Sequence, residues 1–443
     1  MYHPSIYDDS QPVPSYWEAT ASRQGDAYHP LSSDQTCDVA IIGGGYTGLS
    51  AALHLARDHN IDARVLEAGH IGWGASGRNG GFCCLPASRL SIQQMIDRYG
   101  LDETKRFYAA QLEGMDLVRS LETDENIDFD RQGDGNFTVA HRPSRVKHLH
   151  EEAETLTRLF GIKTRVLSKQ EFAEVGHDST EQYGAMYMAA GFALHPLKFL
   201  KGLARAAAGY GAVLYPHSRV ITWTRANRMH KLVARGATLT ARRVIVATNG
   251  FGREGLHPAF DKMVLPALSN IITTRPLTDE ELTRQQWRTE NPICNTRTLL
   301  FYYRMLSDHS FLFGAKGDTT GRPTDGIKMR DWMIRRLGEV FPGWRQIPIT
   351  HFWCGLVCMT RKLTPSLGRL EDDPSVWYGF GYQANGVNTA PWTGMMLARH
   401  IAGVKDVACP LVMRGLAPRF PFAALRLWVL RGAYMYYRFR DAR

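Results

Sequence analysis

Three glycines and one carboxylate carry the clearest chemistry in this sequence. Gly43, Gly45 and Gly48 form a G-x-G-x-x-G spacing, and Glu67 follows about 20 residues later. The first glycine permits a tight turn, the second lets backbone N–H groups approach a pyrophosphate, and the third lets a helix pack closely on a strand. A carboxylate at this distance accepts hydrogen bonds from ribose hydroxyls and repels a 2′-phosphate. The spacing therefore predicts a dinucleotide site.

The elements that would position these residues can be recognised around them. Residues 38–42 form a short apolar run typical of a buried strand, and apolar residues at helical spacing follow over 49–56. A second strand over 64–66 ends at Glu67. A helix between two strands is the crossover that parallel strands require, and its N-terminus adds about half a positive charge beside the phosphates.

Two further glycine-rich segments bear on the choice between NAD and FAD. The first, residues 72–81, begins just after Glu67 and could wrap a pyrophosphate and reach a flavin ring. The second, residues 379–388, leads into a helix over 392–400, whose N-terminus would offer donors and a positive dipole end to the N1–C2=O edge of a reduced flavin. A nicotinamide site needs neither segment, so both favour FAD.

The rest of the chain alternates between helical and β-rich blocks. Helices are expected over 91–125, 146–161 and from Pro196 onward, with strands over 213–215 and 244–248. Residues 127–140 are expected to form a hairpin that turns at 133–136. Residues 263–315 are β-like, and residues 351–403 return to strand, glycine-rich loop and helix. The pattern predicts an α/β fold with a discontinuous cofactor domain interleaved with a second domain.

Composition limits the class of protein. The 443 residues are 44% hydrophobic and 22% charged, which is typical of globular proteins and excludes disorder, collagen and coiled coil. The net charge of +10 suits an anionic cofactor, a membrane surface or nucleic acid. Seven irregularly spaced cysteines favour a reducing compartment over a disulfide framework. With no signal peptide, transmembrane segment or metal-binding spacing evident, we expect a cytoplasmic protein without metal.

Several segments together resemble a known family. They are SYWEATA (15–21), CDVAIIGGGYTGLSAALHLA (37–56), GWGASGRNGG (72–81), HPLKFLKGLARAA (195–207), ATNG (247–250) and the stretch 377–398. These segments resemble FAD-dependent oxidoreductases of the D-amino-acid oxidase superfamily, and within it the γ-glutamylputrescine oxidoreductase branch. The resemblance implies a glutathione-reductase-type, Rossmann-like FAD domain with an interleaved α+β substrate domain built on an antiparallel sheet.

The expected division of the chain follows from this resemblance and from the alternation of blocks. Residues 36–95, 150–265 and 350–412 would form the FAD domain, and residues 96–149 and 266–349 the substrate domain. Residues 1–35 would be an N-terminal extension, and residues 413–443 a basic, aromatic C-terminal helix.

The resemblance also implies a reaction. Hydride would pass from the carbon next to an amine nitrogen to flavin N5, water would hydrolyse the imine, and O2 would reoxidise the flavin to give H2O2. The substrate would be a small-molecule amine or amino-acid-like compound such as γ-glutamylputrescine or another polyamine derivative. The alternative is a dehydrogenase that passes electrons to a quinone or carrier at the membrane. A flavoprotein bound to RNA ranks lowest, since no RNA-binding module accompanies the fold, and no nucleic acid partner is expected.

The resemblance assigns cofactor contacts residue by residue. The pyrophosphate would meet Gly43, Gly45, Tyr46, Thr47 and Gly48, the adenosine ribose Glu67, and adenine the backbone at Val220. The ribityl chain and ring would lie against Ala75, Ser76, Arg78, Asn79, Gly80 and Gly81, and the pyrimidine edge against Asn385, Gly386, Val387 and Asn388. Further contacts are expected at Ala68, Trp73, Ala247 and Thr248.

Two side chains have a role only by analogy with sarcosine oxidases. Lys316 matches a lysine over the flavin that helps activate oxygen, where a fixed cation would stabilise negative charge on O2. Otherwise Lys316 is a solvated lysine at a strand end. Cys358 lies close to the position of covalent flavin attachment, but a buried, inert thiol is the commoner fate of a cysteine. We therefore expect FAD to be bound non-covalently.

The C-terminal segment is basic and aromatic. From Arg414 onward it holds seven arginines and one acidic residue, Asp441, among many aromatic residues. Such a helix could lie on an anionic membrane or contact RNA. The simpler interpretation is a terminal helix packed on the FAD domain, with arginines extending to water.

Overall fold

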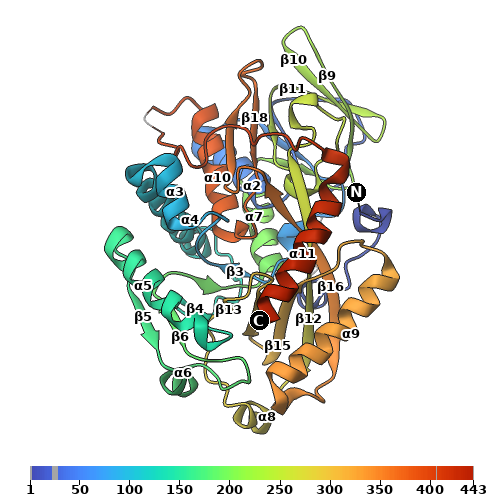
Figure 1. Ribbon diagram of the computed structural model, residues 1–443. Coiled ribbons are helices and arrows are strands. Elements are labelled where there is room, and N and C mark those ends of the chain that lie inside the picture. The colour runs from blue at the N-terminus through green and yellow to red at the C-terminus, as the bar shows by residue number, and fades with distance from the viewer. Residues whose placement is uncertain (1, 22–27, 406, 443) are drawn as a thin grey trace.

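The computed structural model describes residues 2–21, 28–405 and 407–442, so residues 22–27 of the predicted N-terminal extension and Arg443 of the predicted C-terminal helix lie outside the described part. Two large sheets organise these residues, one in the upper and one in the lower half of Figure 1. The helices are α1 (Tyr16–Thr20), α2 (Tyr46–His59), α3 (Ile92–Tyr99), α4 (Leu101–Asp124), α5 (Val146–Phe160), α6 (Lys169–Val175), α7 (Pro196–Gly209), α8 (Asp279–Arg284), α9 (Pro323–Val340), α10 (Gly386–Ile401) and α11 (Arg426–Ala442).

The first sheet has a parallel core. Its strands, in hydrogen-bonded order, are β17 (Ser366–Arg369), β18 (Val376–Phe380), β11 (Ala237–Val246), β1 (Gln35–Ile42), β2 (Ala63–Leu66) and β8 (Val213–Tyr215), with β10 (Met229–Ala234) and β9 (Val220–Ala226) added antiparallel beside β11. β18, β11, β1, β2 and β8 run parallel, as the predicted Rossmann-like domain requires.

Both faces of this sheet are buried. Val39, Ile41 and Val65 point toward the core shared with α2, α7 and α10, whereas Ala40 and Ile42 point to a second core on the opposite face. Burial on both sides explains the uninterrupted apolar run that marks β1 in the sequence.

The second sheet is almost entirely antiparallel. Its order is β16 (Ile349–Thr360), β12 (Val264–Pro276), β15 (Ser310–Lys316), β14 (Phe301–Met305), β13 (Ile293–Asn295), β4 (Asn136–Val139), β6 (Ala185–Met188) and β5 (Thr164–Leu167), and only β13 and β4 pair in parallel. A two-stranded sheet joins β3 (Phe82–Cys83) to β7 (Phe192–Ala193). The predicted fold class, an FAD-type domain interleaved with an antiparallel substrate domain, is confirmed.

Alternation along the second sheet assigns its two faces. Phe301, Tyr303 and Phe313 enter a core with Met333 and Leu337 of α9, and the residues between them face the first sheet. One face is thus covered by α9, and part of the other borders a cavity between the sheets.

Hydrogen bonding corrects parts of the predicted organisation. Residues 127–140 form no hairpin, because β4 pairs with β6 and β13 and not with a neighbouring strand. β5 and β6, expected in the FAD domain within 150–265, lie in the second sheet, as does β16 from the segment 350–412. Short apolar strands do not reveal their distant partners, which explains these errors.

The C-terminal helix also differs from the expectation. The segment expected as a helix from 413 becomes α11 only at Arg426. Leu427, Leu430 and Tyr434 pack with Leu265 and Ala267 of β12, so α11 lies over the second sheet and not on the FAD domain. It crosses the front of the molecule in Figure 1. Within the described residues no helix has the length and apolar character needed to span a membrane.

Candidate active site

Two cavities meet where the glycine motif ends β1. The larger, of about 340 Å³, lies between the first sheet and the face of the second sheet opposite α9, and the smaller, of about 110 Å³, extends beside Glu67 and Val220. They share Gly45, Ala75, Ser76, Ala247 and Asn249. Together they form an elongated site with a narrow waist at the N-terminus of α2.

The waist is built from backbone packed too closely for side chains. A Cβ on Gly48 would lie 1.9 Å from the Gly43 carbonyl oxygen, and one on Gly45 would lie 2.9 Å from Ser76 Oγ. The Ser76 hydroxyl accepts a hydrogen bond from the Tyr46 N–H at 3.0 Å, which joins the first and second glycine-rich segments. The close approach leaves room for a phosphate group where a side chain would otherwise stand.

Glu67 lies at the end of β2 in the smaller cavity. Its carboxylate accepts hydrogen bonds from the Gly44 N–H at 2.7 Å and the Gly69 N–H at 3.1 Å. Burial raises the pKa of Glu67, while these two donors oppose the rise. The carboxylate is therefore fixed in place beside the space expected for a ribose.

Three distant side chains fix the second glycine-rich segment. The Trp353 indole donates to the Arg78 carbonyl at 2.8 Å, the Trp17 indole to the Asn79 carbonyl at 2.9 Å, and Arg304 Nε to the Gly80 carbonyl at 3.1 Å. Three consecutive carbonyls are thus held from α1, β14 and β16. This preorganises the segment before any ligand binds.

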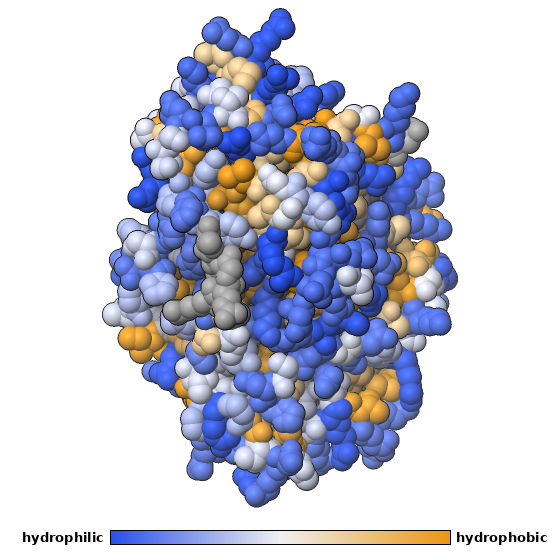
Figure 2. Space-filling model, turned by 180° about the vertical axis from the view of Figure 1, so that it is seen from behind, coloured by the Kyte–Doolittle hydropathy of each residue, from blue (hydrophilic) through white to orange (hydrophobic). Residues whose placement is uncertain are grey.

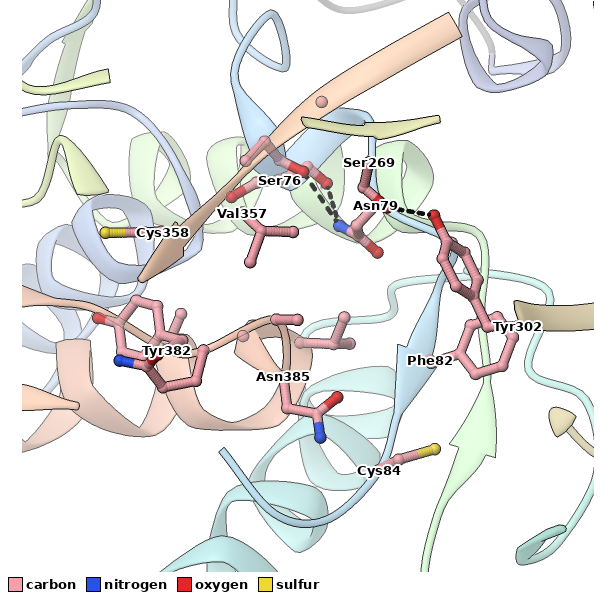
Figure 3. A pocket seen from close by; sticks show the side chains of 18 of the residues that line it. Ser76, Asn79, Phe82, Cys84, Ser269, Tyr302, Val357, Cys358, Tyr382 and Asn385 are labelled. Carbon is pink, nitrogen blue, oxygen red and sulfur yellow. Dashed lines mark hydrogen bonds between the residues drawn. The ribbon is translucent and has the colours of Figure 1, made fainter. Parts of the chain in front are cut away.

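The larger cavity has a wall on the second sheet made of one or more residues from each of six adjacent strands. In strand order these are Gly355, Leu356, Val357 and Cys358 of β16, Ser269 and Ile271 of β12, Lys316 of β15, Tyr302 of β14, Cys294 of β13, and Asn136 and Thr138 of β4. Figure 3 shows Tyr302 and Phe82 on one side of the open space and Tyr382 and Asn385 on another. The Ser269 and Tyr302 hydroxyls are joined by a hydrogen bond of 2.9 Å.

Most of the residues predicted from the sequence line these cavities. In the larger or smaller cavity lie Gly43, Gly45, Tyr46, Thr47, Glu67, Ala68, Trp73, Ala75, Ser76, Arg78, Asn79, Gly80, Val220, Ala247, Thr248, Lys316, Asn385, Gly386 and Val387. Three predicted residues do not. Gly48 packs on Gly43, Gly81 packs on the Leu194 carbonyl, and the Asn388 side chain points to α4, where its Nδ2 donates to the Gln111 carbonyl at 3.1 Å.

Lys316 is buried and not at a solvated strand end. It is 8% exposed and borders the larger cavity. Burial, and then the neighbouring Arg89 guanidinium, lower the pKa of Lys316 well below its usual value. Cys358 also lines the cavity, and burial raises the pKa of its thiol to about 12, so the group is a neutral thiol at pH 7.

Sequence reasoning missed several lining residues. Arg89, Tyr302 and Cys294 come from loops and strands with no recognisable motif, and Arg304 was missed because it acts on a carbonyl far away in sequence. Only the β14 alternation Phe301, Tyr302, Tyr303 offered a signal, and it does not indicate which face borders a cavity.

The site formed by the two cavities fits FAD. The two cavities provide a waist for a pyrophosphate, a fixed carboxylate for a ribose, and a larger chamber at the N-terminus of α10 for a ring system.

Comparison with known proteins identifies the family. The family described as "DAO: FAD dependent oxidoreductase" matches residues 38–400. The γ-glutamylputrescine oxidoreductase of Escherichia coli K12 is 32% identical over 88% of this chain and 89% of its own, and the glycine oxidase of Bacillus subtilis is 21% identical over 82% and 92%.

Solved structures show the same fold. The glycine oxidase from Geobacillus kaustophilus has 22% identity and a TM-score of 0.67, and covers 83% of this chain and 95% of its own. The L-proline dehydrogenase from P. horikoshii has 18% identity and a TM-score of 0.68, and covers 86% and 96%. The geometry of the two cavities and the sequence match both indicate an FAD-binding protein, and this chain belongs to the DAO family of FAD-dependent oxidoreductases.

Proposed function

We propose that this protein oxidises a C–N bond of an amine or amino-acid-like substrate. The observation that supports it is the charge of the larger cavity, whose described lining contains Arg78, Arg89 and Lys316 but no aspartate, glutamate or histidine. Nearby cations and burial both favour the neutral form of an amine. A neutral amine has the lone pair that assists loss of hydride from the adjacent carbon, so no protein base is required.

The chain's own residues would orient both partners. When FAD is bound, its ring supplies the acceptor for the hydride. Hydrogen bonds donated to the carbonyls of residues 78–80 hold the segment that would border the ring. The N-terminus of α10 at Gly386 directs a positive dipole end into the same cavity. Water is excluded by the apolar lining from Phe82, Leu85, Ile271 and Leu300.

The substrate we favour is γ-glutamylputrescine or a related polyamine derivative, and the acceptor we favour is O2. The relative that is 32% identical carries the first name, and Lys316 places a buried amino group on the cavity wall, where its protonated form would stabilise negative charge on O2. Cytoplasmic action is part of the proposal and is supported by seven cysteines that are all free.

We propose that FAD is held without a covalent bond. The neutral Cys358 thiol is a poor nucleophile, since the thiolate is the reactive form. Acid precipitation of the purified protein should leave the yellow colour in the supernatant. Colour retained in the pellet, with a matching mass increase on the peptide containing Cys358, would overturn this part of the proposal.

One observation favours a second candidate, a dehydrogenase that passes electrons to a quinone at a membrane. The outer face of α11 exposes Trp428, Val429, Met435, Tyr436 and Phe439, each more than half exposed. The opposite side of the molecule, shown in Figure 2, is mostly hydrophilic with scattered apolar patches. An apolar face with neighbouring arginines suits an anionic lipid surface.

Acceptor specificity separates the two candidates. An oxygen electrode and a peroxide assay with a panel of amines should show one H2O2 formed per O2 consumed. Turnover only with a quinone, together with binding to vesicles of anionic phospholipid, would instead establish the second candidate.

A further inference from the structure

The N-terminal residues reach the cofactor site from outside the family match. That match covers residues 38–400, whereas Tyr7 ends a short 3-10 turn, Pro4–Tyr7, and lines the smaller cavity. Tyr7 is absent from the described lining of the larger cavity, so it borders only the part that contains Glu67 and Val220. These two residues are the ones expected beside the ribose and the adenine of FAD. Tyr7 therefore lies at the adenosine end of the site.

One end of this N-terminal segment is attached to the second sheet. The Tyr2 hydroxyl donates a hydrogen bond to the Pro266 carbonyl of β12 at 3.1 Å, and the His3 N–H donates to the Thr320 carbonyl at 3.0 Å. Tyr2 shares a buried cluster with Leu427 of α11, and Figure 1 shows the N-terminal end of the chain beside that helix. The described part of the segment thus begins on the second sheet.

The other end is attached to two separate parts of the wall of the smaller cavity. Asp9 forms an ion pair with Arg219, in which one carboxylate oxygen lies 2.5 Å from Nη2 and 3.1 Å from Nε. Arg219 immediately precedes Val220, the first residue of β9. The Gln11 carbonyl accepts a hydrogen bond from the indole of Trp73 at 3.2 Å, and Trp73 belongs to the second glycine-rich segment. The N-terminal segment therefore bridges β9 and the second glycine-rich segment.

This bridge is closed but only partly buried. The side chain of Arg219 is 39% exposed and that of Asp9 is 23% exposed. Solvent and salt screen an ion pair of this kind, so the pair stabilises the closed arrangement modestly. Contacts of this strength keep a segment in place for most of the time and still allow it to open locally.

We propose that residues Tyr7–Gln11 form a strap across the adenosine end of bound FAD. The Tyr7 ring contacts the adenosine, and the ion pair between Asp9 and Arg219 holds the strap closed. FAD leaves the holoenzyme when the strap opens, so the strap sets the rate of FAD release. The inference goes beyond the proposed function, because it concerns the cofactor and holds for any substrate.

Release of FAD from the holoenzyme tests the strap. The holoenzyme is diluted to nanomolar concentration without substrate, and released FAD is measured as a rise in flavin fluorescence. Asp9→Asn removes the charge that pairs with Arg219 and should raise the release rate about 3–10-fold. Asp9→Glu keeps the charge and should retain part of the slow release. A release rate in Asp9→Asn equal to that of the native protein would overturn the proposal.

Variants of Tyr7 test the contact with the adenosine. Tyr7→Ala removes an aromatic ring from the cavity wall and should raise the release rate by about ten-fold or more. Tyr7→Phe keeps the ring, and its release rate should stay within about two-fold of the native rate. Native release from Tyr7→Ala, or release from Tyr7→Phe as fast as from Tyr7→Ala, would show that the ring does not cover the cofactor.

Two controls separate the strap from a general effect on the fold. Asp331→Asn removes an exposed carboxylate that pairs with Arg330 within α9, and it should leave the release rate unchanged. The absorption bands of FAD still bound to the Asp9 and Tyr7 variants should match those of the native protein, because the strap does not border the ring. Shifted bands would show that these substitutions disturb the larger cavity, and the proposal would be wrong.

The measurements also keep this inference apart from the proposed function, since none of them uses an amine. A holoenzyme that no amine reduces, but that releases FAD faster in Asp9→Asn and Tyr7→Ala, would refute the proposed function and retain the strap. A holoenzyme that amines reduce, and whose release rate neither substitution changes, would refute the strap alone.

Discussion

The two walls of the large cavity are built in different ways. The wall on the first sheet consists of backbone, with Gly43, Gly45 and Gly48 in contact distance of other main-chain or hydroxyl atoms. The wall on the second sheet consists of side chains, taken from successive strands and facing one way by alternation. Backbone presents the same N–H groups whatever the substrate, whereas side chains can be exchanged strand by strand. We infer that the first wall determines whether the cofactor binds and the second determines what is oxidised.

This difference predicts two kinds of mutant. Changes in the backbone wall should remove the flavin, because an added Cβ would displace main chain at Gly43 and Gly48 and the Ser76 hydroxyl at Gly45. Changes in the side-chain wall should retain the flavin and alter kinetics. Single substitutions in each wall test that separation, and their expected effects on the enzyme decrease from Gly48 to His177.

Gly48→Ala should have the largest effect. The new Cβ would lie 1.9 Å from the Gly43 carbonyl oxygen, so α2 must move away from the end of β1. We expect flavin content, measured as the 450 nm to 280 nm absorbance ratio, to fall at least about ten-fold. Gly209→Ala, at the open end of α7, is the control and should purify yellow. Full flavin content in Gly48→Ala would show that the backbone wall is not the cofactor cradle.

Lys316→Met should slow reaction of the reduced enzyme with oxygen by about 100-fold, since a single fixed charge at a reacting centre has that order of effect. The limiting rate of flavin reduction at saturating amine should change little. Stopped-flow measurement of the two half-reactions separates them, and exposed Lys105→Met on α4 is the control. Equal slowing of both half-reactions would contradict the role proposed for Lys316.

Tyr302→Phe should have a moderate effect confined to substrate binding. The variant loses the 2.9 Å hydrogen bond between the Tyr302 and Ser269 hydroxyls on the cavity wall. We expect KM to rise by about 2–10-fold, the equivalent of one net hydrogen bond, with unchanged flavin content. Tyr436→Phe, on the exposed face of α11, should leave KM unaltered. Loss of flavin from Tyr302→Phe would mean that the second wall also holds the cofactor.

How much the sequence reveals also differs between the walls. The glycine spacing, Glu67 and the strand–helix–strand pattern could be interpreted locally, because each motif lies within one continuous segment. The second wall could not, since Lys316, Tyr302 and Cys294 come together only through strand order and register. Asn388 illustrates the limit within a correct motif. It lies on the first turn of α10, but helical rotation turns its side chain to Gln111 and away from the cavity.

The smallest effect on activity at neutral pH is expected at His177, which lies in the core behind the second wall. Burial lowers the pKa of His177 to about 3, against an ordinary value of 6.5. Between these values the unfolded chain binds a proton and the folded protein does not, so stability falls as pH decreases from about 6.5 toward 3. His177→Phe should reduce the loss of Tm between pH 7.5 and pH 5, measured by calorimetry, with KM unchanged. An unchanged pH dependence would show that His177 is not buried as a neutral group.

Anaerobic mixing of the FAD-reconstituted protein with γ-glutamylputrescine, followed at 450 nm, tests the central claim most directly. We expect a protein that absorbs at 450 nm and loses this absorbance as substrate is added, with the amine carbon oxidised in equal amount. A protein that stays colourless after reconstitution, or a bound flavin that no amine in a panel of carboxylate-bearing and simple amines reduces, would contradict it.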